Sequence, residues 1–133
     1  MFEEIDEKKK RIEERRPLPD KTVESIREKL MLDWIYNSNA IEGNTLSLSE
    51  TKVVLEDGIT IGGKTLNEHL EVINHKKAII YIEDIIEENK PLIEREIKDV
   101  HNLILKRIDD KNAGRYRDQK VVISGAEHIP PEP

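Results

Sequence analysis

The stretch Ser38–Leu46, SNAIEGNTL, decides how the chain is divided into elements. Its first half, Ser38 to Glu42, is compatible with a helix, and Gly43 is a residue type that commonly follows a helix end. The sequence therefore predicts that Glu42 is a carboxylate at the point where a helix stops. It is either an ordinary surface acid or a group presented to a partner.

The residues before this stretch predict one long helix, from about Thr22 to Glu42. Four apolar residues recur at intervals of three and four, and Ile41 follows further on; the four are Val23, Ile26, Leu30 and Trp34. This period is typical of an amphipathic helix, so we expect the four to form one buried stripe. A charged helix over residues 2–16 precedes it and is ended by Pro17 and Pro19.

The residues after this stretch predict three more helices and one hairpin. Two capping boxes, Ser47–Glu50 and Thr65–Glu68, start a short helix and a long one that runs to about Asn89. A further helix covers about residues 93–108. The β-branched run Val121–Ser124 predicts a short strand, which residues 116–119 would pair with. We therefore expect a mainly α fold with one small β-hairpin near the C-terminus.

The composition narrows the class of function. The chain has 133 residues and a formal charge of −6, which argues against nucleic acid as the main partner. It has no cysteine, so it has no disulfide and no thiolate metal site. The charged N-terminus and the short apolar runs predict neither a signal peptide nor a membrane span. We expect a soluble, cytoplasmic protein.

Motif chemistry in these residues does not describe a complete enzyme. The loop ITIGGK, residues 59–64, has glycines and a lysine but lacks the spacing of a phosphate-binding P-loop. His69 and His75 are six residues apart, which places them on different faces of a helix, so we expect no metal site. We identify no catalytic residue.

A resemblance to a known family begins at SNAIEGNTL. Ser38, Glu42 and Gly43 match (S/T)-x-x-x-E-(G/N), the inhibitory-helix motif of the Fic (Fido) family, whose members transfer AMP from ATP to a hydroxyl group of a target protein. Other positions also fit the family: Tyr36, Ile41, Asn44 and Leu46. Further on, ITIGGKTLNEHLEVINHKKAI resembles the loop and helix that open the Fic core, and GRYRDQKVVISGAEHIPPEP resembles the segment with the flap. The resemblance covers about residues 33–133.

One family motif is absent from the sequence. The family's active site, H-x-F-x-(D/E)-G-N-G-R-x-x-R, follows the flap, and no histidine of this chain stands in such a motif. The resemblance therefore implies the N-terminal part of a longer Fic protein, inactive alone. It implies an N-terminal helix and linker (1–19), an inhibitory helix region (20–46) and a partial Fic core (47–133). A Fic-like helical bundle would be incomplete here.

The resemblance also implies roles for particular residues. Glu42 would pair with the second arginine of the catalytic motif, which otherwise holds the γ-phosphate of ATP, because a carboxylate fits a guanidinium as a phosphate does. Gly43 would let the chain turn away, and Ser38 would face the same side as Glu42. The flap residues Val121, Val122, Ile123 and Ser124 would hold the target protein by strand addition.

Cofactors and partners follow from these roles. The complete protein would use ATP with Mg²⁺, and this chain alone none. The partners would be a target protein hydroxyl, and the rest of a Fic domain in the same chain. Exposed apolar surface would favour a homo-oligomer. Two alternatives stay open: a stand-alone, antitoxin-like module that inhibits another Fic protein in trans, and a helical interaction domain with no role for nucleotides.

Overall fold

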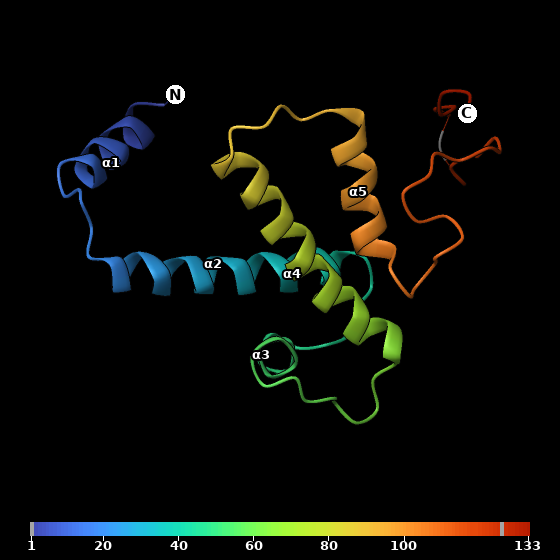
Figure 1. The fold of residues 1–133 in the computed structure, drawn as a ribbon, viewed down its shortest axis with the longest axis horizontal. Coiled ribbons are helices and arrows are strands. Elements are labelled where there is room, and N and C mark those ends of the chain that lie inside the picture. The colour runs from blue at the N-terminus through green and yellow to red at the C-terminus, as the bar shows by residue number, and fades with distance from the viewer. Residues whose placement is uncertain (1, 126) are drawn as a thin grey trace.

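The computed structural model describes residues 2–125 and 127–133. Within them five helices follow one another (Figure 1): α1 (Glu3–Glu13), α2 (Asp20–Ile41), α3 (Leu48–Glu56), α4 (Leu66–Glu87) and α5 (Glu94–Leu105). Their positions confirm the helices predicted from the sequence, with small differences at the ends. Met1 and Ala126, which fall in the predicted N-terminal and flap segments, lie outside the described residues.

Helix α4 is the centre of the fold. It packs against α2, α3 and α5, and Figure 1 shows it crossing α2 while α5 runs beside it. Both capping boxes form, so Ser47 begins α3 and Thr65 begins α4. The core lies where α2, α3 and α4 meet, and its buried members are Ile35, Leu46, Val54, Val72 and Ile79.

The predicted buried stripe of α2 is wrong. Val23, Ile26, Leu30 and Trp34 expose 47%, 48%, 61% and 55% of their surface, whereas Ile35 is fully buried. One residue along a helix is a rotation of about 100°, so α2 turns the neighbouring face toward α4. The stripe instead lines an open groove of about 880 Å³ between α2, α4 and the linker at Pro17 and Leu18.

The predicted β-hairpin is also wrong, because residues 2–125 and 127–133 contain no strand. Val122 exposes 85% of its surface and Ile123 52%. A two-stranded hairpin is marginally stable unless a third strand or a helix covers its apolar face. In the structure residues 121–124 are all exposed, so no described helix covers the apolar face that a hairpin would present.

A large surface stays exposed in this arrangement. The chain exposes 10,897 Å², whereas a compact protein of 15.5 kDa exposes about 7,200 Å². Helix α1 contributes to the excess, since all its residues are exposed. Among the described helices, none is both long and apolar enough to cross a bilayer.

The burial pattern of α2 predicts unequal effects of two substitutions. Ile35→Ala should lower the free energy of unfolding by about 2–5 kcal/mol, because it opens a cavity in the core. Leu30→Ala should change it by less than about 1 kcal/mol, because Leu30 is mostly exposed. Urea denaturation followed by circular dichroism measures both. Equal losses would contradict the assignment of the buried face.

Candidate functional site

The C-terminus of α2 ends in a tightly defined turn. Glu42 is its C-cap, and Gly43 has a φ of +99°, in the left-handed region that glycine favours. The Gly43 N–H donates to the Ala40 carbonyl at 3.1 Å, and the Asn44 N–H donates to the Asn39 carbonyl at 3.0 Å. These two bonds form a Schellman motif, so the backbone direction at Glu42 is fixed.

The side chain of Asn44 ties this turn to the start of α4. Its Nδ2 donates to the Glu68 carbonyl at 2.9 Å and to Glu71 Oε2 at 2.7 Å. Its Oδ1 accepts a hydrogen bond from the N–H of Leu46 at 3.0 Å. Leu46 itself is buried in the core. One amide therefore joins the turn after α2 to two residues of α4 and to the core.

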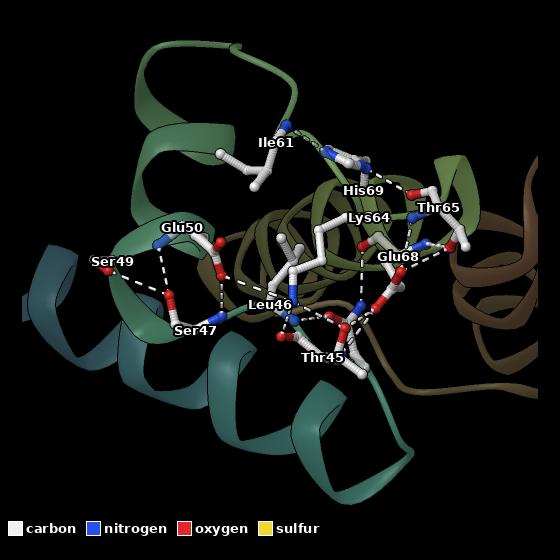
Figure 2. Close-up of polar contacts among 11 residues, drawn as sticks. Thr45, Leu46, Ser47, Ser49, Glu50, Ile61, Lys64, Thr65, Glu68 and His69 are labelled. Carbon is white, nitrogen blue, oxygen red and sulfur yellow. Dashed lines mark hydrogen bonds and ion pairs between the residues drawn. The ribbon is translucent and has the colours of Figure 1, made fainter.

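Glu68 is a second connection between the turn and α4 (Figure 2). Its Oε1 accepts from the backbone N–H of Thr45 at 3.0 Å and from the Thr45 hydroxyl. Its Oε2 accepts from the N–H of Thr65 at 2.8 Å and from the Thr65 hydroxyl at 2.9 Å. The hydrogen bonds from Thr45 and Thr65 hold the pKa of Glu68 at about 2, well below its ordinary 4.5. The sequence predicted Glu68 only as part of a capping box, and it did not predict the contacts with Thr45.

The loop before α4 packs on the other side of Thr45. The Lys64 ammonium donates to the Thr45 carbonyl and to its hydroxyl at 3.0 Å, and it lies 4.0 Å from Glu50 Oε2. His69 is buried, with Nδ1 2.6 Å from the Thr65 carbonyl and Nε2 accepting from the Ile61 N–H at 2.8 Å. A neutral ring protonated at Nδ1 satisfies both contacts. The ITIGGK loop is therefore a structural support here.

Glu42 and Ser38 lie beside one cavity of about 260 Å³, which we call the Glu42 cavity. Its lining residues come from the end of α2, the middle of α4 and the end of α5 with the turn after it: Ser38, Asn39, Glu42, Glu71, His75, Ile104, Leu105 and Ile108. Glu42 is exposed, and no hydrogen bond or ion pair among the described residues involves its carboxylate. Two carboxylates and a hydroxyl thus border this cavity, together with an amide, an imidazole and three apolar side chains.

His75 forms the wall of this cavity on the α4 side. Its Nδ1 lies 3.1 Å from Asn39 Nδ2, and its ring meets that of Trp34 edge-on at 6.2 Å. Because an amide Nδ2 is a donor, His75 Nδ1 is the acceptor and the ring is neutral. Burial lowers the pKa of His75, which also favours the neutral form.

The predicted site residues fall into two separate places. Ser38 and Glu42 share the cavity and Gly43 adjoins it, while Val121–Ser124 follow α5 and line neither this cavity nor the core. The sequence did not predict that Glu71 lines this cavity or that Asn44 forms hydrogen bonds to Glu68 and Glu71. It identified Asn44 only as a position that matches the family. The described residues contain no group of His, Cys, Asp and Glu that could hold a metal ion.

The curated proteins that are similar in sequence to this chain carry the same name. No family model matches the chain. It is 37% identical over 100 residues to the protein adenylyltransferase Fic of Nematostella vectensis, covering 74% of this chain and 23% of that protein. It is 30% identical to the Fic protein of Culex quinquefasciatus, covering 99% of this chain and 26% of that protein. The chain thus spans about a quarter of the length of these relatives.

Solved structures agree with the sequence relatives. Fic-1 of C. elegans (residues 134–508) superimposes with a TM-score of 0.73 at 31% identity, covering 82% of this chain and 33% of that one. A Fic-domain signalling protein of Bacteroides thetaiotaomicron gives a TM-score of 0.74 at 29% identity, covering 82% of this chain and 42% of that one. The helical arrangement in Figure 1 is therefore that of part of a Fic fold.

The lowered pKa of Glu68 predicts a pH dependence of stability. A carboxylate with a folded pKa of about 2 and an ordinary value of 4.5 stabilises the fold fully above pH 4.5 and loses this effect as pH falls toward 2. Glu68→Gln should therefore lower the melting temperature at pH 7, and its difference from wild type should shrink between pH 4.5 and 2. Glu24→Gln, on the exposed face of α2, is the control, and melting is followed by circular dichroism. A difference in melting temperature that stays constant with pH would contradict a stabilising role for the hydrogen bonds of the Glu68 carboxylate.

Proposed function

This chain belongs to the Fic family across the segment that it shares with those proteins, and on that premise we propose that it is the regulatory and target-docking part of a protein adenylyltransferase. In this role Glu42 restrains AMP transfer by binding an arginine of the catalytic motif. The observation that supports the proposal best is the position of Glu42, exposed at the end of α2 beside a cavity that a second carboxylate borders.

The Glu42 cavity has the chemistry to receive a guanidinium group. An arginine side chain offers five N–H donors in one plane, and carboxylate oxygens are their strongest partners. Glu42, Glu71 and the Ser38 hydroxyl supply acceptors from two helices. His75 is neutral and does not repel a cation. A bound guanidinium would be occupied by the carboxylates and so withdrawn from a phosphate group.

The rigidity of the turn supports this role. The Schellman motif at Gly43 and the hydrogen bonds of Asn44 fix the backbone on both sides of Glu42. A held carboxylate loses less conformational freedom on binding than one on a mobile loop, so more of its interaction energy appears as affinity. Asn44 and Glu68 are in this proposal positioning residues, because they act through the placement of Glu42.

We propose that ATP with Mg²⁺ is held by the Fic catalytic motif and not by these 133 residues. The catalytic motif that would bind the phosphates is absent from the sequence, and the described residues offer no carboxylate cluster for a metal ion. In this proposal a separate catalytic part, which pairs with this chain, binds the nucleotide and transfers AMP.

Residues Val121–Ser124 are proposed to dock the target protein. All four are exposed and lie outside regular secondary structure, so their backbone groups are accessible. Pairing with an extended segment of a target would satisfy those groups by main-chain hydrogen bonds, which is how strand addition gives affinity. The absence of a strand in the described residues is compatible with a flap that becomes ordered when its target binds.

The proposal predicts a gain of activity when Glu42 is removed. In a protein that carries this segment together with the Fic catalytic motif, Glu42→Gly should raise incorporation of AMP from labelled ATP by about 10- to 150-fold. That range corresponds to a lost charge-assisted hydrogen bond of about 1.5–3 kcal/mol.

The control for this experiment is Glu88→Gly. Glu88 is the C-cap of α4 and has nearly the same backbone angles as Glu42, φ −81° and ψ 1° against −82° and 1°. It does not line the Glu42 cavity. Unchanged labelling in Glu42→Gly, or an equal rise in Glu88→Gly, would remove the inhibitory role.

A second experiment separates action within one protein from action in trans. The 133-residue chain is added to a Fic enzyme that has lost its own inhibitory glutamate. If the chain is a stand-alone inhibitor, labelling should fall with its concentration, and the Glu42→Gly chain should have no effect. If Glu42 acts only within its own protein, neither chain changes labelling at micromolar concentration.

A further inference from the structure

A second cavity, of about 430 Å³, lies between α5 and the segment that follows it. We call it the basic cavity, after the residues that line it. Helix α5 and the following segment both contribute lining residues. They include Ile97, Lys98 and His101 of α5, and Arg115, Tyr116 and Arg117 of the segment. The proposed role of Glu42 does not involve these side chains.

The wall of the basic cavity is held against α5 by one glycine. Gly114 has a φ of +69°, and a Cβ there would lie 3.1 Å from Asn102 Cβ and 3.2 Å from the Lys98 carbonyl oxygen. Its N–H donates to His101 Nδ1 at 3.1 Å. Any larger residue would push the segment away from α5. The segment therefore follows α5 closely, and the cavity exists before any ligand arrives.

The charged residues that line the basic cavity are all of one sign. Its lining includes Lys98, Arg115 and Arg117, and no Asp or Glu, although the chain as a whole has a formal charge of −6. His101 accepts at Nδ1, so its neutral ring has the proton on Nε2 and is a donor there. Arg117 gives one Nη2 hydrogen bond to the Pro131 carbonyl and keeps further donors.

Lys98 is the best-placed of these cations. Its Nζ lies 4.7 Å from the centre of the Tyr116 ring, a cation–π distance, and 2.7 Å from Glu94 Oε1. The hydrogen bond that Lys98 donates to Glu94 raises the pKa of Lys98, so the ammonium stays charged at neutral pH. Glu94 is 64% exposed, and exposed ion pairs of this spacing are weak. Another carboxylate can therefore replace Glu94 with little loss.

We propose that the basic cavity binds an acidic peptide segment of a protein partner. Three cations on two elements exceed what a single small anion needs, and they suit several carboxylates along a chain. Ile97 and Tyr116 expose 51% and 64% of their surface beside these cations, which offers apolar contact to the same peptide. The segment continues directly into Val121–Ser124, so a partner bound here lies next to the proposed flap.

The test uses the whole 133-residue chain and a fluorescein-labelled hexaglutamate peptide. Fluorescence anisotropy at about 0.15 M salt measures the dissociation constant. Arg115→Glu and Tyr116→Ala should each weaken binding, the first by about tenfold or more, since it replaces a charge-assisted contact with repulsion. Lys111→Glu is the matched control: it makes the same charge change nearby, at a residue that does not line the cavity. It should change the dissociation constant by less than about twofold.

Several outcomes would overturn the proposal. They are the absence of binding, an equal loss in Lys111→Glu and Arg115→Glu, and inorganic phosphate binding with the affinity of the peptide, which would indicate a small-anion site. Circular dichroism of each variant confirms folding, and Arg115 is exposed, so its replacement leaves the core intact. The measurement needs no ATP. Its result is therefore independent of the Glu42 experiment, and either proposal can fail without the other.

Discussion

The hydrogen bonds between the turn after α2 and the start of α4 are the constraint on which the site depends. Asn44 and Glu68 make them, and their oxygens also accept hydrogen bonds from the backbone N–H groups of Leu46 and Thr45 respectively. Without these bonds α2 could end in many directions, because Gly43 has no Cβ to limit its conformation. With them, Glu42 and Ser38 are placed on one wall of a cavity that α4 and α5 complete.

The chain separates its charges by location. Carboxylates border the Glu42 cavity, whereas cations border the basic cavity, and Leu105 lies between the two as a lining residue of both. In a protein with a formal charge of −6, such separation requires that most acidic residues lie elsewhere, on solvated helix faces. The charged residues of each cavity suit a ligand of the opposite charge, in line with the proposed guanidinium in one and the proposed acidic segment in the other.

Helix α2 shows why periodicity alone did not identify the buried face. A clear helical period relates four apolar residues of α2, which are Val23, Ile26, Leu30 and Trp34. The residue of α2 that is buried in the core is nevertheless Ile35. The pattern reports which residues share a face, and it does not report which neighbour that face meets. In this structure the stripe faces a groove of about 880 Å³, which holds no other described element of the chain.

The sequence alone determined the helices, the capping boxes at Ser47 and Thr65, and the placement of Glu42 at a helix end, because these depend on neighbours a few residues apart. It also identified the family, through a short motif made of Ser38, Glu42 and Gly43 and the residues around it. Only the tertiary structure decided that Asn44 reaches Glu71, that Ser38 and Glu42 share a cavity, and that Val121–Ser124 remain unpaired. Those outcomes depend on how α4 crosses α2, and contacts between residues distant in sequence are set by packing rather than by local preference.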